Sequence, residues 1–299
     1  MKAILHFNWY IMDHTPCNVQ TSSGSKIFLQ VKTKFNSGKI RGMKMKTFYF
    51  TATGNSLYVA KRIGGDLCSI PQMLKEGTSE FEDEVIGFVF PCYGFAPPRM
   101  VINFIRKSKF KANYFFAIMT YGNKAASGLR CIEKIGSQAD IQFNYTNEIV
   151  MIDNYLPIYK IEGQLKKEAS KKTEEKLEQI VRDIKSRQNQ LTRKGFVSDV
   201  LSKAGSKLTA KINHDDGDKQ FIVRDNCNSC KVCEKVCPIN NIKVDTKPEY
   251  LHNCEGCFAC IHHCPQTAIH LKYERSNARF INRNVKLKEI IDANNQSNS

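Results

Sequence analysis

The 299-residue chain has little that would direct it into or across a membrane. No run approaches the ~18 uninterrupted apolar residues of a transmembrane helix, so we expect no membrane span. The beginning of the sequence also lacks the layout of a secretory signal, because Asp13 and His14 interrupt its apolar stretch. Twelve cysteines without an export signal argue against a disulfide framework and for metal or redox chemistry. The sequence therefore predicts a cytoplasmic protein.

The sequence also lacks the two common glycine-rich nucleotide fingerprints, G-x-x-x-x-G-K-[ST] and G-x-G-x-x-G. This absence disfavours a nucleoside triphosphate and leaves no recognisable site for NAD(P)H. The net charge of +16 suggests nucleic acid, but segments 1–46 and 164–211 each carry +7 and hold most of the excess. Nucleic-acid-binding proteins usually carry a recognisable reading module, and none is found here. We therefore expect no nucleic-acid partner.

Strand and helix patterns alternate from residue 47 onward. Apolar runs rich in β-forming residues occupy 47–50, 67–70, 85–91, 114–120 and 141–151. Apolar residues at helical spacing occupy 55–63, 98–107 and 124–135. The acidic stretch 76–84 is interpreted as a solvated connection. This alternation predicts an α/β fold in which helices cover both faces of a parallel sheet.

The segments outside this pattern divide the chain further. Residues 1–44 lack sustained periodicity and are interpreted as a poorly ordered leader or a translation start placed too early, with a native appendage as the alternative. Residues 166–212 form a basic linker, whose amphipathic helix at 167–194 is expected to pack on the sheet; docking an acidic partner is the alternative. Residues 276–299 form a C-terminal tail.

A duplicated cysteine motif is the strongest signal in the sequence. The pattern C-x₂-C-x₂-C-x₃-C-P occurs at Cys227, Cys230, Cys233 and Cys237, and again at Cys254, Cys257, Cys260 and Cys264. Three cysteines at this spacing can surround three iron corners of one cubic cluster, and the longer step followed by proline carries the fourth cysteine elsewhere. Paired C-x-x-C sequences also build structural zinc sites, which is the competing interpretation.

The spacing resembles that of bacterial two-cluster ferredoxins. The resemblance implies that each [4Fe-4S] cluster takes three ligands from one motif and the fourth from the other. One cluster would be held by Cys227, Cys230, Cys233 and Cys264, and the other by Cys254, Cys257, Cys260 and Cys237. His262 and His263, inside the second motif, are interpreted as solvated loop residues, with tuning of a cluster potential as the alternative.

A second motif follows the first expected strand. The sequence Thr51-Ala-Thr53-Gly54-Asn55-Ser56 leads directly into an expected helix. Backbone N–H groups at a helix N-terminus, together with hydroxyl groups, form a cradle for a phosphate group. The motif resembles the flavodoxin phosphate loop T/S-x-T-G-x-T, with Ser56 in place of the last threonine. This resemblance implies a bound FMN.

Two further loops follow expected strands, at the sheet edge where doubly wound folds bind ligands. An isoalloxazine ring needs apolar or aromatic cover and backbone groups at its polar edge. The candidates for these contacts are Pro91, Tyr93, Phe95, Thr120, Tyr121, Gly122 and Asn123. Cys92 is interpreted as an inert thiol, as are Cys17, Cys68 and Cys131.

The order of the two motifs resembles the flavodoxin–ferredoxin fusion proteins of anaerobic bacteria and archaea, over about residues 45–273. The resemblance implies a flavodoxin-like, doubly wound, five-stranded parallel sheet at 45–165, followed by a small α+β two-cluster ferredoxin domain at 213–275. The chain departs from flavodoxins in lacking a flanking tryptophan, because its one tryptophan, Trp9, lies in the expected leader.

These features predict an electron-transfer flavo-iron–sulfur protein that exchanges electrons between two clusters and FMN, with a redox protein as donor or acceptor. Two alternatives stay open. One is an FMN-dependent oxidoreductase that acts on a small organic molecule and is fed by its own ferredoxin domain. The other is a redox-sensing interaction protein. The sequence does not identify a catalytic residue.

Overall fold

The computed structural model of the chain describes residues 44–123, 125, 127–191 and 215–296. Its central sheet has five strands in the order β2-β1-β4-β6-β7, and every pairing in it is parallel. The strands are β1 (Met45–Tyr49), β2 (Asp66–Ser69), β4 (Val85–Pro91), β6 (Tyr114–Tyr121) and β7 (Tyr145–Val150). This is the strand order of flavodoxin-like doubly wound folds. The expected α/β fold with a five-stranded parallel sheet is confirmed.

The central strands explain why their sequence pattern is easy to recognise. β4 is buried at every position through Phe90, and β6 is buried at every position through Thr120. A strand in the middle of a parallel sheet is covered on both faces, so its sequence is apolar without alternation. The expected strand 85–91 therefore matches the observed β4.

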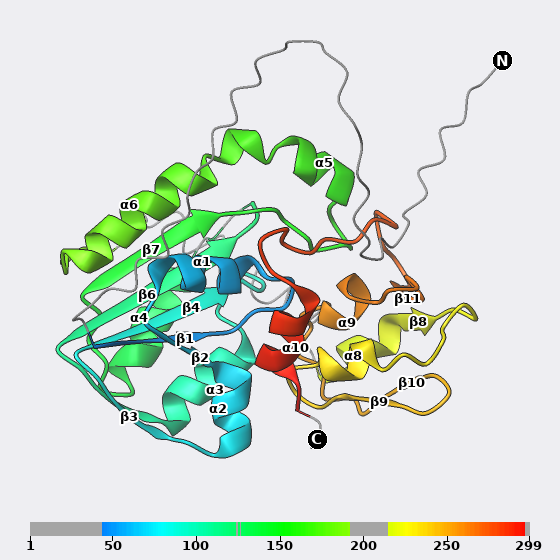
Figure 1. Cartoon of the computed structure of the whole chain (residues 1–299), viewed down its shortest axis with the longest axis horizontal. Coiled ribbons are helices and arrows are strands. Elements are labelled where there is room, and N and C mark those ends of the chain that lie inside the picture. The colour runs from blue at the N-terminus through cyan, green and yellow to red at the C-terminus, as the bar shows by residue number, and fades with distance from the viewer. Residues whose placement is uncertain (1–43, 124, 126, 192–214, 297–299) are drawn as a thin grey trace, which may run out of the picture. The chain divides into compact units, whose positions relative to one another are not determined.

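Helices cover both faces of the sheet (Figure 1). α1 (Asn55–Ile63) and α6 (Thr173–Lys185) pack on one face. α2 (Ile70–Glu76), α3 (Arg99–Lys107) and α4 (Gly128–Ser137) pack on the other. The expected helices at 55–63, 98–107 and 124–135 therefore correspond to α1, α3 and α4.

The expected helix at 167–194 is shorter in the structure. α5 (Ile161–Lys166) and the 3₁₀ turn η1 (Ala169–Lys171) precede α6. Lys172 adopts a φ of 48°, which interrupts the helical path before α6 begins. Leu177, Ile180 and Ile184 are buried against the sheet, so α6 packs one apolar stripe as expected. Residues 192–214, and with them the expected start of the ferredoxin domain, lie outside the described residues.

The acidic stretch 76–84 is not only a solvated connection. Its residues form β3 (Glu80–Glu82), which pairs in parallel with β5 (Lys109–Lys111). Phe81 is buried in the aromatic cluster beneath the pair, while Glu80 lies 2.9 Å from Lys109. The strand forms because a buried apolar residue alternates with exposed charged residues. The high charge of the stretch makes this alternation difficult to recognise in the sequence.

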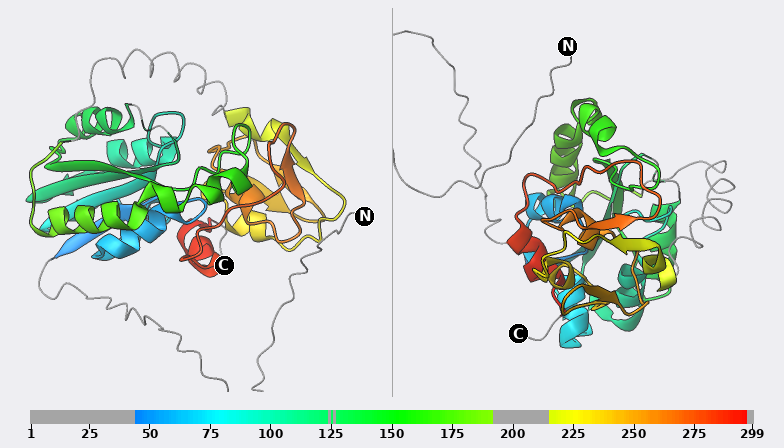
Figure 2. Two further views of the ribbon diagram at one scale, coloured as in Figure 1. Left: turned by 90° about the horizontal axis from the view of Figure 1, so that it is seen from above. Right: turned by 90° about the vertical axis from the view of Figure 1, so that its right-hand side faces the viewer.

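The cysteine-rich residues form a small duplicated unit beside one end of the sheet (Figure 2). It contains β8 (Phe221–Val223), α8 (Val232–Lys235), β9 (Ile242–Val244), β10 (Pro248–Tyr250), α9 (Ala259–His262) and β11 (Ile269–Leu271), after the 3₁₀ turn η2 (Asp215–Gln220). β8 pairs with β11 and β9 with β10, both antiparallel. Each cysteine motif thus gives one short helix followed by one short strand.

The last described residues return to the sheet. α10 (Leu287–Asn294) and the preceding Val285 pack into the same core as α1, and Ile290 and Asn294 are fully buried. Most of the expected C-terminal tail is therefore folded; residues 297–299 lie outside the described residues. No helix among the described residues has the length and apolar character needed to cross a membrane.

Candidate functional site

The turn between β1 and α1 forms one wall of a cavity at the carboxyl end of the sheet. Thr51, Thr53, Asn55 and Ser56 line this cavity, which encloses about 1180 Å³ when space open to solvent is counted. α1 begins at Asn55, so the first N–H groups of the helix have no partner within the helix and are available to a ligand. The expected phosphate loop is thus located at the edge of a cavity.

Gly54 has a different role from the other loop residues. Its φ of 98° lies in the left-handed region, and its side-chain position faces the C-terminal segment. A Cβ on Gly54 would lie 3.0 Å from the Cβ atoms of Asn282 and Val285. Gly54 therefore allows the turn and the close packing behind it, and it does not line the cavity.

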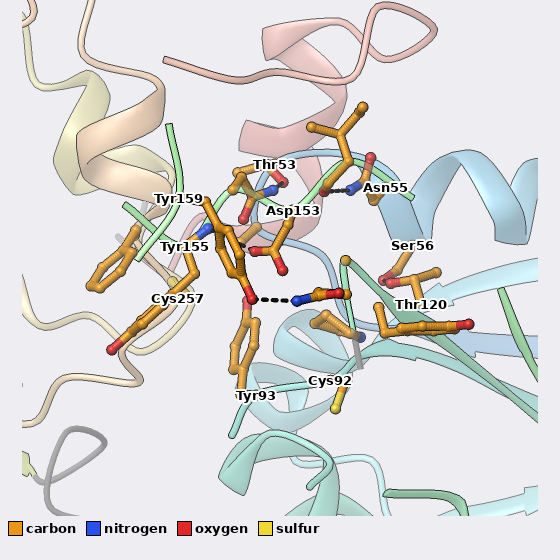
Figure 3. Close-up of a pocket in the computed structure, with 18 of the residues that line it drawn as sticks. Thr53, Asn55, Ser56, Cys92, Tyr93, Thr120, Asp153, Tyr155, Tyr159 and Cys257 are labelled. Carbon is orange, nitrogen blue, oxygen red and sulfur yellow. Dashed lines mark hydrogen bonds between the residues drawn. The ribbon is translucent and has the colours of Figure 1, made fainter. Parts of the chain in front are cut away.

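The hydroxyl groups of the loop are held in fixed positions. The N–H of Gly54 donates to Oγ1 of Thr51 at 3.2 Å. Oγ of Ser56 lies 2.9 Å from Oγ1 of Thr120, which belongs to β6. Nδ2 of Asn154 donates to Oγ1 of Thr53 at 2.7 Å. Hydroxyl groups therefore join the β1–α1 segment to the end of β6 and to the loop after β7 (Figure 3).

All of the residues expected to contact FMN, except Gly54, line this cavity. Those from the two later loops are Pro91, Tyr93, Phe95, Thr120, Tyr121, Gly122 and Asn123. Gly122 allows a close approach, because a Cβ there would lie 2.2 Å from Cβ of Asp153. Cys92, which was expected to be inert, also lines the cavity. The thiols of Cys68 and Cys131 are away from the cavity, and burial raises the pKa of each.

The loop that follows β7 also lines the cavity, although no motif in the sequence predicts it. It contributes Ile152, Asp153, Asn154, Tyr155, Ile158 and Tyr159 to the cavity. Nδ2 of Asn123 donates to the hydroxyl of Tyr159 at 2.8 Å, so this loop meets the loop after β6 across the cavity. Its position could have predicted this role, because it follows a strand of the parallel sheet and the carboxyl ends of parallel strands lie at the same edge.

Asp153 is an ionisable group inside the cavity. Its Oδ1 accepts a hydrogen bond from the N–H of Tyr155 at 3.1 Å, and burial raises its pKa above the ordinary value. Beneath it, Nζ of Lys171 donates to the carbonyl oxygens of Gly122 and Met151. The cavity thus contains a carboxyl group that holds its proton more tightly than an exposed aspartate does.

Two smaller cavities lie among the cysteines. One, of about 290 Å³ with its solvent-open space, is lined by Cys227, Cys230, Cys233 and Cys264. The other, of about 320 Å³ on the same measure, is lined by Cys237, Cys254, Cys257 and Cys260. These are the two sets of four that the ferredoxin resemblance implies. Among the described residues, no three His, Cys, Asp or Glu side chains are placed to hold a single metal ion.

The two cysteine motifs repeat each other in backbone conformation as well as in sequence. Positive φ angles occur at equivalent positions, in the pairs Ser229 and Gly256, Lys231 and Phe258, and Asn240 and Thr267. The sulfur of Cys237 accepts an N–H hydrogen bond from Asn241 at 3.3 Å, and the sulfur of Cys264 accepts one from Ala268 at 3.2 Å. The repeated turns direct both fourth cysteines toward the cavity of the other motif.

Cys257 and Phe258 connect the large cavity to the second cysteine cavity. Both residues line both cavities, so they form a shared wall. The ring of Phe258 stacks on Tyr155 with the ring centres 5.6 Å apart. Figure 3 shows Cys257 and Tyr155 on the side of the large cavity opposite Ser56 and Thr120.

The expectation that His262 and His263 are solvated loop residues is wrong. Their exposed fractions are 2% and 3%. Nε2 of His262 donates to the carbonyl of Asn154 at 3.0 Å, Nδ1 accepts from the N–H of Phe280, and burial lowers the pKa of His262 to about 3. Nε2 of His263 donates to the carbonyl of Ala52 at 2.9 Å. Burial also lowers the pKa of His263, so it favours the neutral form of both rings. The two rings join the cysteine-rich unit to the loops of the large cavity.

Comparisons with solved structures concern only part of the chain. The Trp repressor binding protein of Bacillus subtilis is 14% identical, with a TM-score of 0.27, over 36% of this chain and 84% of that one. A candidate flavoprotein of Bacteroides uniformis is 15% identical, with a TM-score of 0.29, over 37% and 92%. A candidate flavoprotein of Bacteroides eggerthii is 16% identical, with a TM-score of 0.26, over 35% and 87%. No protein-family model and no curated protein matches the chain.

Proposed function

We propose that the chain is an electron-transfer protein in which a bound FMN and two [4Fe-4S] clusters exchange electrons. The observation that carries this proposal is the wall formed by Cys257 and Phe258, which separates the large cavity from a cavity lined by four cysteines. FMN accepts one or two electrons and a cubic cluster accepts one, so the combination would link two-electron and one-electron transfers.

The residues of the large cavity fit FMN. The loop after β1 offers N–H groups and hydroxyls to a phosphate, as a singly esterified phosphate requires. Tyr93 and Tyr121 offer aromatic surface to the ring, and Gly122 lets the loop after β6 pack closely against Asp153 at the wall of the cavity. Each of these groups belongs to the loops at one edge of the sheet, which brings phosphate and ring contacts into one site.

The cysteine cavities fit two clusters. Each set of four thiols surrounds its own space, and backbone N–H groups are directed at the sulfurs of Cys237 and Cys264. Burial raises the pKa values of Cys233 and Cys254 to about 12, so these thiols ionise only if a positive charge compensates them, and iron would supply that charge.

A redox protein fits as the partner. Cys230 is exposed, and it belongs to the cysteine set that does not share a wall with the large cavity. An external protein could therefore approach this set from solvent. The large cavity, in contrast, is lined on one side by the cysteine-rich unit itself, through Cys257 and Phe258.

One observation favours the oxidoreductase alternative. Asp153 lies in the large cavity with a pKa raised by burial, so it is suited to deliver a proton to a small molecule beside the flavin. If this alternative holds, the protein should turn over a small organic acceptor without a second protein, and Asp153→Asn should slow that turnover.

The test starts from protein purified without oxygen. About eight iron and eight sulfide ions and about one FMN per chain are expected. Stopped-flow spectra would then be recorded with reduced ferredoxin-type proteins and with small organic acceptors. Reaction with the proteins alone supports the carrier, and turnover of a small molecule alone supports the enzyme. Protein that holds zinc instead of iron, or no flavin, contradicts both.

A further inference from the structure

Three successive carbonyl groups of the loop after β1 accept hydrogen bonds from residues far along the chain. The oxygens belong to Thr51, Ala52 and Thr53. Their donors are Nδ2 of Asn294 at 2.9 Å, Nε2 of His263 at 2.9 Å and the backbone N–H of Asn282 at 2.8 Å. None of the three donor residues lines the large cavity. The carbonyl groups are therefore held on the side of the loop that faces away from the cavity.

This arrangement determines where the N–H groups of the loop point. In a trans peptide, the carbonyl of one residue and the N–H of the next point in opposite directions. No cis peptide bond occurs among the described residues. When the carbonyls of Thr51 and Ala52 are held outward, the N–H groups of Ala52 and Thr53 turn toward the cavity. The next N–H, that of Gly54, is bound by Oγ1 of Thr51.

The donors are themselves firmly placed. The exposed fractions of Asn294, His263 and Asn282 are 0%, 3% and 7%. Asn294 also donates to the carbonyl of Val236 at 3.3 Å, next to Cys237 in the chain, and His263 directly precedes Cys264. Asn282 also donates through Nδ2 to Oδ1 of Asn55 at 3.0 Å. The loop is thus tied to the cysteine-rich unit and to the C-terminal segment.

We propose that His263, Asn282 and Asn294 are positioning residues of the phosphate site. Asn294 and His263 hold the carbonyls of Thr51 and Ala52 outward so that the N–H groups of Ala52 and Thr53 meet the phosphate. Asn282 fixes the next peptide of the loop through the carbonyl of Thr53. This inference rests on the proposed binding of FMN and adds that the phosphate site is completed by the cysteine-rich unit and the C-terminal segment. The sheet with its own helices supplies only the loop.

Binding of FMN and of riboflavin distinguishes a positioning role of these donors from a general effect on stability. Riboflavin has the ring of FMN but no phosphate. If the donors act by directing N–H groups at the phosphate, their loss should weaken FMN binding and leave riboflavin binding nearly unchanged. If they only stabilise the fold, both ligands should lose affinity by the same factor.

The experiment measures the dissociation constants of FMN and riboflavin by flavin fluorescence, using full-length protein freed of flavin with its iron retained. Asn294→Leu keeps the volume of the side chain and removes its donor. We expect the FMN constant to rise about tenfold and the riboflavin constant to change less than about twofold. The matched control is Asn284→Leu, an exposed residue of the same segment whose side chain makes no hydrogen bond with a described residue; it should change neither constant.

A second pair of variants tests the same idea at another donor. His263→Leu removes the donor to Ala52, whereas His263→Gln keeps an N–H group that can reach the same carbonyl. The first should lose the preference for FMN and the second should retain most of it. An unchanged preference in Asn294→Leu and His263→Leu would overturn the inference, as would an equal loss for both ligands. Wild-type protein without any preference for FMN would instead contradict the proposed function.

Discussion

Replacement of Gly54 by alanine should reduce both the stability of the protein and its affinity for FMN. The φ of 98° costs a residue with a Cβ about 1–2 kcal/mol. The new Cβ would also lie 3.0 Å from the Cβ atoms of Asn282 and Val285, and these atoms can move only if the backbone of the C-terminal segment moves. Strain and crowding together should lower the free energy of unfolding by roughly 2–4 kcal/mol.

Gly77, which follows α2, provides a matched control for this experiment. Its φ of 72° and ψ of 12° lie in the same left-handed region as those of Gly54, but a Cβ there would meet no atom within 4 Å. Gly77→Ala should therefore lose only the conformational share of the stability, about 1–2 kcal/mol. The difference between the two variants measures the contact of the loop with the C-terminal segment.

Urea unfolding and FMN titration of the two variants provide the assay. Gly54→Ala should show the larger loss of stability. Its FMN dissociation constant should rise at least about tenfold, because a loop displacement that weakens binding by ~1.4 kcal/mol raises the constant tenfold. Gly77→Ala should bind FMN like the wild type. Equal losses of stability in the two variants, with equal FMN affinity, would refute both the packing argument and the placement of the phosphate.

Three further predictions concern the walls of the cavity. Gly122→Ala places a Cβ 2.2 Å from Cβ of Asp153, so Asp153 must move and FMN affinity should fall in a fluorescence titration; unchanged affinity would contradict the close approach. Cys257→Ala and Cys230→Ala should each lose about half of the iron. Only Cys257→Ala should alter the visible spectrum of the bound flavin, because only Cys257 lines its cavity. Asp153→Asn should stabilise the flavin-free protein at about pH 7 and have little effect at about pH 3. Burial raises the pKa of Asp153 above 3.8, so above that pH the folded state binds more protons than the unfolded state and stability falls as pH rises. A gain that is independent of pH in urea unfolding would contradict this reasoning.

The sheet and its central strands can be predicted because short stretches of sequence determine them. β4 is apolar throughout because it is covered on both faces, and α1 ends at Gly64 because glycine is a common helix end. The helix expected at 167–194 shows the limit of periodicity. The apolar residues keep a helical spacing over this range of the sequence. In the structure, however, Lys172 adopts a left-handed conformation directly before α6, and α6 ends at Lys185.

The part of the site that carries motifs was also predictable. The hydroxyl and glycine pattern of the loop after β1 identifies residues that line one cavity, with the exception of Gly54. The loop after β7 has no such pattern, because Asp153 and its neighbours line the cavity only through their position at the sheet edge. Cys257 and Phe258 line the same cavity as the loop after β1, which lies about 200 residues earlier in the chain. A local sequence pattern cannot predict a contact between such distant residues.

The two histidines illustrate the same limit. Their neighbours in sequence include cysteines and a proline, which suggests an exposed turn. In the structure, carbonyl groups of Asn154 and Ala52 accept their hydrogen bonds, and these partners are more than 100 residues away in the chain. Burial of a polar ring requires such partners, and sequence alone does not reveal them.

The most direct test of the central claim is diffraction from anaerobically grown crystals at the iron absorption edge. The anomalous signal should show one four-iron group among Cys237, Cys254, Cys257 and Cys260, and another among Cys227, Cys230, Cys233 and Cys264. Electron density for FMN should place its phosphate at Thr53 and Ser56, with the ring extending toward Cys257. Single zinc ions at the cysteines, or a flavin bound away from this cavity, would contradict the claim.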